Sequence, residues 1–163
     1  MKKLKTLLVF AACLVAIASC KKEAAVVEPI SHSNTSGSFE LLQKKVLTKS
    51  CATNGCHASE ADVSFKQHKL VLTGADLYTR LINGSVANSK AVSAGLKQIV
   101  PKDADKSFFY QKVIFSKSAH QYGNAMPLGA DALTDKKLQF IKDWIVAGAP
   151  EKGHVADEEL LLH

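Results

Sequence analysis

The sequence predicts a small, mostly α-helical domain with long loops. Its 163 residues are enough for one domain with tails, and an apolar fraction of 47% is sufficient for a hydrophobic core. Apolar side chains recur at helical spacing in the segments that begin at Ser38 and Thr134. The loop before the last helix, residues 116–133, is rich in Gly and Asn, and loops of such length indicate a function or a buried ligand.

Residues 1–19 are expected to be a lipoprotein signal peptide. Three lysines precede an uncharged apolar run of 12 residues, Leu7–Ala18, which is typical of a secretory signal. The run is shorter than the about 20 residues that a membrane-spanning helix needs. It ends in Ile-Ala-Ser-Cys, which resembles a bacterial lipobox. The resemblance implies that Cys20 receives a diacylglyceryl group and becomes the new N-terminus; the alternative is an ordinary signal peptide with an incidental cysteine.

Residues 20–37 mix charged residues with Pro, Ser, Asn and Gly without periodicity, so a lipidated, flexible tether is expected there. The protein would then be exported to a bacterial cell envelope and held on a membrane by lipid, facing the periplasm or the cell surface. The signal peptide holds three of the six net positive charges, which leaves +3 on residues 20–163. Nucleic-acid binding is not expected, because there is no arginine cluster or basic stripe with aromatic residues.

The folded domain is expected to begin with a helix that leads into a pair of cysteines. Ser38 can cap this helix, and apolar side chains follow it at i, i+3 and i+7 spacing. Residues 68–72 read as a short extended stretch, with His68 as a surface residue before it.

Two shorter helices are expected in the middle of the chain. In residues 73–84, Thr73 and Asp76 form a pair like a capping box, three apolar side chains share one face, and Gly84 can end the helix. In residues 100–115, a proline places a turn before a helix that carries two phenylalanines.

The last helix has the clearest signals. Thr134 can cap it, and Gly148 and Pro150 follow in the order expected at a helix end. Trp144 lies on the apolar stripe of this helix and is expected to be a core residue near a bound ligand rather than a redox relay. The C-terminal tail, residues 151–163, is expected to add a short helix against the domain.

Residues 49–59 read KSCATNGCHAS. The c-type haem attachment signal is usually C-x-x-C-H, and here the spacer is two residues longer. Because His57 directly follows Cys56, the iron ligand stays close to one thioether, and only Cys51 has to reach further to the other vinyl group. The Asn-Gly pair before Cys56 suits a bulge, since both residue types tolerate positive φ.

A disulfide is the alternative for the same two cysteines. Cys13 lies in the signal peptide and Cys20 would carry lipid, so Cys51 and Cys56 are the cysteines left in the folded part. Exported domains often form disulfides, and the longer spacer relieves strain in the closed loop. The motif alone therefore leaves open a haem-free lipoprotein that acts as a binding or structural module. Zinc is disfavoured, because no second pair of ligands has suitable spacing.

A second axial ligand is expected far downstream. Met126 is the methionine that remains after processing, and Pro127 follows it in a Gly-rich loop. A methionine in a polar loop is better explained as a ligand than as a core filler, and His/Met ligation raises the potential of a haem. His120 is the alternative distal ligand. The carbonyl of Pro101 is one candidate acceptor for a hydrogen bond from the second ring nitrogen of His57.

Two segments resemble a known family. AMPLGADALTDKKLQFIKDWIVAGAP, residues 125–150, is similar to the C-terminal half of a small bacterial c-type cytochrome domain, in which a Met-Pro loop precedes a capped helix that ends in Trp-Ile-x-x-Gly-Ala-Pro. IVPKDADKSFFYQKV, residues 99–113, resembles the family's Pro-loop and Ser-aromatic helix. The resemblance is to the planctomycete-type cytochrome c domains and their relatives, and it covers about residues 40–150. The chain departs from the pattern at Lys102, where the family often has glycine.

The resemblance implies a cytochrome c-like helical domain over residues 38–150 that binds one haem c covalently. Cys51 and Cys56 would form the thioethers, with His57 as the proximal and Met126 as the distal iron ligand. The protein would then be a membrane-anchored electron carrier rather than an enzyme, with redox proteins as partners, because two axial ligands leave iron no open position. The alternative is a haem enzyme or gas sensor in which Met126 is labile.

Overall fold

The structure is a computed structural model that describes residues 37–114 and 121–162. The predicted signal peptide, the lipidation site Cys20, nearly all of the tether, and His120 lie outside these residues. Within the described ranges the chain is mostly helical and forms isolated bridges but no β-sheet, so the mostly α class is confirmed. No helix of the described part is both long and apolar enough to cross a membrane.

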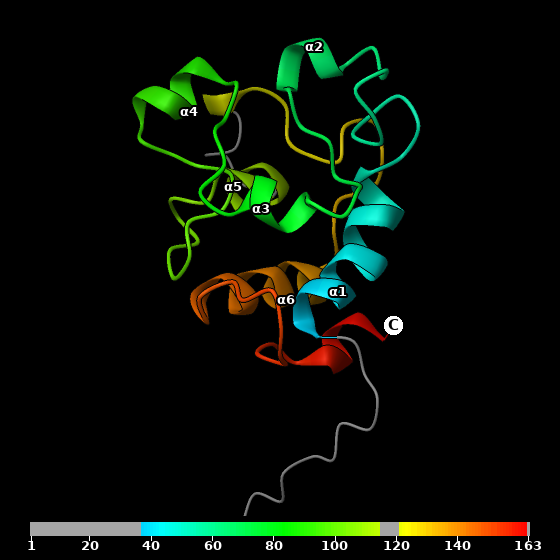
Figure 1. Cartoon of the computed structure of the whole chain (residues 1–163), viewed down its shortest axis with the longest axis vertical. Coiled ribbons are helices and arrows are strands. Elements are labelled where there is room, and N and C mark those ends of the chain that lie inside the picture. Colours follow the sequence, from blue (N-terminus) through cyan, green and yellow to red (C-terminus); the bar gives the residue numbers. More distant parts are fainter. Residues whose placement is uncertain (1–36, 115–120, 163) are drawn as a thin grey trace, which may run out of the picture. The chain divides into compact units, whose positions relative to one another are not determined.

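Figure 1 shows the elements in chain order, and most of them contribute to one hydrophobic core. Ala91 of α4 instead belongs to a smaller cluster with Val86 and Leu96, and α2 has no buried residue. In chain order they are α1 (Ser38–Leu42), the π-helix η1 (Gln43–Cys51), α2 (Phe65–His68), α3 (Leu77–Leu81), α4 (Ser89–Ser93), α5 (Phe108–Val113), α6 (Asp135–Val146) and the 3₁₀ helix η3 (Glu158–Leu161). The helix expected before the cysteines is present, and it ends at Cys51 itself.

The first helix is tied to the C-terminal segment. Gly37, and not Ser38, is the N-cap of α1. The fully buried Ser38 hydroxyl oxygen instead accepts hydrogen bonds from the N–H groups of Val155 and Ala156, at 2.9 and 3.2 Å. The capping prediction for Ser38 was therefore wrong, because a contact across the fold takes the acceptor that a local cap would use.

The last helix matches its prediction. The Thr134 hydroxyl oxygen accepts the N–H of Lys137 and caps α6. Trp144 is fully buried, stacks on Phe39 with ring centroids 5.6 Å apart, and donates its indole N–H to the carbonyl of Pro150 at 3.0 Å. Trp144 is thus a core residue, as predicted. The helix expected in the tail is also present, as η3, which contacts both α6 and α1 (Figure 1).

The helix α3 is shorter than predicted and starts differently. Asp76 is its N-cap residue but makes no side-chain cap bond, and forms an ion pair with Arg80 instead. The Thr73 hydroxyl donates to the carbonyl of Ala58 at 2.8 Å, so the capping-box prediction was wrong. Gly84 follows the helix where a Cβ would lie 1.9 Å from the carbonyl oxygen of Arg80, so no other residue fits without a shift of the backbone.

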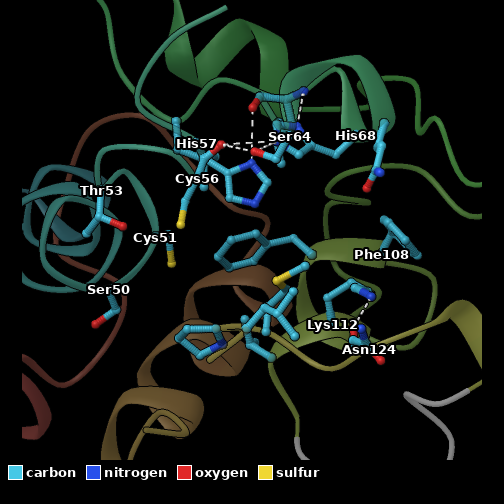
Figure 2. Close-up of a pocket in the computed structure, with 18 of the residues that line it drawn as sticks. Ser50, Cys51, Thr53, Cys56, His57, Ser64, His68, Phe108, Lys112 and Asn124 are labelled. Carbon is cyan, nitrogen blue, oxygen red and sulfur yellow. Dashed lines mark hydrogen bonds between the residues drawn. The ribbon is translucent and has the colours of Figure 1, made fainter. Parts of the chain in front are cut away.

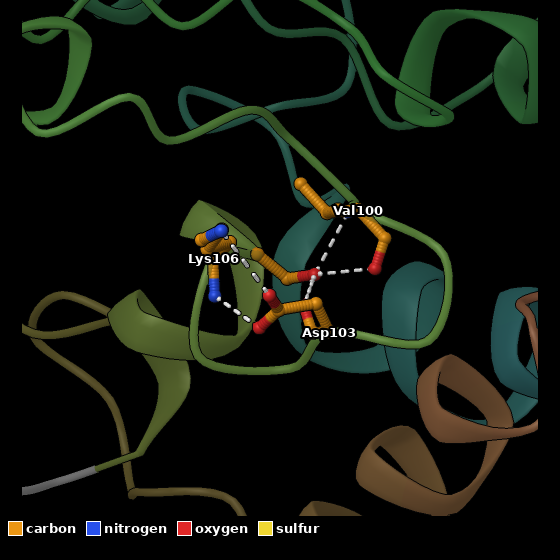
Figure 3. A network of polar contacts seen from close by, with 4 residues as sticks. Val100, Asp103 and Lys106 are labelled. Atoms are coloured by element: carbon orange, nitrogen blue, oxygen red, sulfur yellow. Dashed lines mark hydrogen bonds and ion pairs between the residues drawn. The ribbon is translucent and has the colours of Figure 1, made fainter.

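A polar turn precedes α5 (Figure 3). The Ser107 hydroxyl donates to the carbonyl of Asp103 at 2.7 Å and accepts the N–H of Val100 at 2.9 Å, while the N–H of Lys106 bonds to the Asp103 carboxylate at 2.9 Å. Lys102, inside this turn, has a φ of +70°. Glycine adopts that conformation without strain, whereas lysine does so rarely.

Candidate functional site

A cavity of about 430 Å³ lies among the predicted ligands. Its size is within the range of about 300–1,000 Å³ found for small-molecule and cofactor pockets. Cys51, Cys56, His57 and Met126 all line it. The fold therefore brings together four residues that are spread over some 75 positions of the sequence.

The two cysteines differ in their environment. Cys51, at the end of η1, is 7% exposed, whereas Cys56 lies exposed in the following loop, and no disulfide joins them. Figure 2 shows both side chains on the same side of the pocket. Burial, helped by the nearby Cys56 thiol, raises the pKa of Cys51 to about 11. Cys51 is therefore a protonated thiol at neutral pH.

A buried carboxylate organises the loop around Cys56. The Asp62 side chain accepts the N–H groups of Gly55, Ala58 and Ser59, at 2.9, 2.9 and 2.8 Å. These hydrogen bonds, led by those from Ser59 and Gly55, hold the pKa of the Asp62 carboxyl below its ordinary value. Gly55 has a φ of +81°, so the bulge predicted before Cys56 is confirmed. Asp62 was not predicted as a site residue, because its only sequence signal is an acidic residue soon after a glycine-containing loop.

His57 is held in one tautomer and points into the pocket (Figure 2). Its Nδ1 lies 3.1 Å from the carbonyl oxygen of Leu70. Because a carbonyl only accepts, Nδ1 carries the proton, and Nε2 keeps a free lone pair. Burial lowers the pKa of His57 and so favours the neutral ring that a metal ligand requires.

The acceptor of the His57 proton differs from the prediction. Leu70, and not Pro101, provides the carbonyl. The backbone after α2 runs beside His57, and the N–H of Leu72 bonds to the His57 carbonyl at 2.8 Å. Leu70 and Leu72 therefore hold the ring and the backbone carbonyl of His57.

Met126 is half-buried and held by its backbone. Its N–H donates to the carbonyl of Lys112 at 2.7 Å. The Lys112 ammonium in turn donates to the carbonyls of Tyr122 and Asn124, which precede Met126 in the loop. Burial lowers the pKa of Lys112. Figure 2 places Lys112 and Asn124 across the pocket from His57, so Met126 is anchored to residues that face the histidine.

His68 was assigned to the surface before a strand, and this prediction was wrong. It is the last residue of α2, is half-buried and lines the same cavity. Its ring centroid lies 4.0 Å from that of His57. Its contacts with Cys56 and His57 join segments about 12 residues apart, which no local sequence pattern marks.

The donor set suits a haem held by two thioethers. Two free thiols can add to vinyl groups, and a neutral imidazole and a thioether are ligands that haem iron accepts. In residues 37–114 and 121–162, no group of three or more His, Cys, Asp and Glu side chains is arranged to hold a metal ion. Comparisons with protein-family models, curated proteins and solved structures gave no match.

Proposed function

We propose that this chain is a monohaem c-type cytochrome that is anchored to a membrane by lipid on Cys20 and carries single electrons between redox proteins. One observation carries the proposal: Cys51, Cys56, His57 and Met126 line one cavity, and the His57 ring bonds to Leu70 through Nδ1, with no partner for Nε2 among residues 37–114 and 121–162. A disulfide module would need the two thiols but would not need a neutral histidine and a methionine in the same cavity.

Each residue has a distinct task in this proposal. Cys51 and Cys56 would attach the haem through two carbon–sulfur bonds, and His57 and Met126 would be its iron ligands. The haem supplies reversible one-electron chemistry when it is bound. The chain contributes orientation through the His57–Leu70 hydrogen bond and exclusion of water by the buried core around Cys51.

The fold is compatible with the proposed family. The described residues are mostly helical, and the Thr134-capped helix α6 and the turn at Lys102 lie in the segments that resemble the planctomycete-type cytochrome c domains. The cytochrome c-like fold itself is part of the proposal. The proposal includes export to a bacterial cell envelope, with the domain facing the periplasm or the cell surface, and it rests on the lipoprotein signal expected in residues 1–19.

Covalent haem is the test. The full-length chain, produced with a cytochrome c maturation system, should be coloured and should keep its haem on a denaturing gel and through acid–acetone extraction. A variant with Cys51→Ser and Cys56→Ser is the matched control and should lose the haem under the same treatment. A colourless wild-type protein with an intact Cys51–Cys56 disulfide would overturn the proposal and favour the haem-free module.

A second measurement separates an electron carrier from a haem enzyme or gas sensor. If His57 and Met126 both hold the iron firmly, no position would remain for a small molecule, and the reduced wild-type protein should not bind carbon monoxide at rest. Rapid binding would show that Met126 is labile and would favour the sensor or enzyme instead.

A further inference from the structure

A closed circuit of hydrogen bonds links the attachment segment to the end of α2. The His57 Nδ1–H donates to the carbonyl of Leu70 at 3.1 Å. The N–H of Leu70 donates to Nδ1 of His68 at 2.9 Å. His68 Nε2 lies 3.1 Å from the carbonyl oxygen of Cys56, which belongs to the peptide bond between Cys56 and His57. The circuit thus begins at the His57 ring and ends at the carbonyl of the residue before it.

The circuit fixes the tautomers of two neighbouring imidazoles in opposite senses. His68 Nδ1 accepts a backbone N–H, so the proton of the neutral ring is on Nε2, where the Cys56 carbonyl can accept it. His57 carries its proton on Nδ1. Ser64 reinforces the arrangement, because its hydroxyl donates to the Cys56 carbonyl at 2.8 Å and lies 3.0 Å from His68 Nε2.

We propose that His68 is the positioning residue of the His57 ligand. It holds Leu70 in the place where the Leu70 carbonyl can accept the His57 proton, and it holds the Cys56–His57 peptide from the other side. A hydrogen bond from the second nitrogen of a ligating histidine fixes the ring and raises its basicity. His68 therefore sets how strongly His57 donates to iron, a role that rests on the proposed function, while the hydrogen-bond circuit itself does not.

Three substitutions separate the contacts of His68. His68→Phe keeps an aromatic ring beside His57 and removes both nitrogens. His68→Asn keeps an acceptor for the Leu70 N–H, because an asparagine side chain often accepts the N–H of the residue two positions later. His68→Gln places its amide near the position of Nε2, which keeps the Cys56 contact and removes the acceptor beside Leu70.

Two readouts on the full-length chain test the proposal. Amide hydrogen exchange of Leu70 should be about tenfold or more faster in His68→Phe and His68→Gln than in wild type, and close to wild type in His68→Asn. In the haem-loaded protein, the midpoint potential should rise in His68→Phe and His68→Gln, because a less basic ligand stabilises the oxidised iron less, and His68→Asn should restore it.

Opposite results would overturn the positioning role. If His68→Phe leaves both the Leu70 exchange and the potential unchanged, His68 does not hold the circuit. If His68→Asn behaves like His68→Phe in both readouts, the ring matters only for packing. The exchange measurement needs no haem, so a colourless protein would end the proposed function while the circuit is still tested.

Discussion

The Cys51 thiol offers the sharpest test of the site, because its reactivity can be calculated from its burial. We consider alkylation by iodoacetamide in the full-length chain made without haem. The thiolate is the reactive form. The pKa of Cys51 is raised from 9.0 to about 11, and two units correspond to a roughly 100-fold smaller thiolate fraction at pH 7–8. Cys51 should therefore react at least about 100-fold more slowly in the folded chain than in the urea-unfolded chain.

The assay is peptide mass spectrometry of the two cysteines over a pH series. The Cys51 rate should rise about tenfold per pH unit up to pH 10, since the thiol remains below its pKa, and should level off above pH 11. The exposed Cys56 should be labelled first at neutral pH. In Cys56→Ser the second cause of the shift is gone, so Cys51 should react faster than in wild type while remaining slower than in urea.

Two results would refute this reasoning. Equal Cys51 rates in the folded and unfolded chains would mean that the end of η1 is not buried as described. Absence of labelling at both cysteines, reversed by a reducing agent, would mean that a disulfide has formed and would support the haem-free alternative.

Three further predictions address the distal ligand, the core and the anchor. Met126→Ala should lower the midpoint potential by about 0.1 V or more and should open iron to carbon monoxide, whereas His120→Ala should do neither; the reverse pattern would make His120 the ligand. Ser38→Ala removes the acceptor of two N–H groups and should lower the free energy of unfolding by about 1–3 kcal/mol, measured by urea titration. An unchanged urea midpoint would contradict the hydrogen bonds described between Ser38 and the C-terminal segment. Cys20→Ala should block lipid labelling and processing, and membrane retention in that variant would require another anchor.

The elements that the sequence predicted well are those with local signals at both ends. The helix α6 has Thr134 at its start and Gly148 at its end, where φ is +104°. Both rules act within a few residues along the chain, so a sequence pattern can carry them. The bulge at Gly55 was predictable for the same reason, since a positive φ favours glycine.

The failures share a physical cause, which is competition from contacts between distant segments. Ser38 and Thr73 have side chains that cap helices, but both are engaged by backbone groups elsewhere in the fold. The acceptor for His57 is a main-chain carbonyl at Leu70. Every residue has a carbonyl, so no residue type marks the one that folding brings to the histidine. The role of His68 was missed because its contacts with Cys56 and His57 also join separate segments.

The longer spacer between Cys51 and Cys56 is compatible with the proposed haem attachment. Closing a loop of four residues instead of two costs only about 0.6 kcal/mol in chain entropy. Part of this cost is offset by hydrogen bonds within the protein. Asp62 accepts the N–H of Gly55 inside the spacer and those of Ala58 and Ser59 just after His57, and His68 contacts the Cys56 carbonyl. These contacts hold the chain on both sides of the Cys56–His57 peptide, which the proposed ligation by His57 would require.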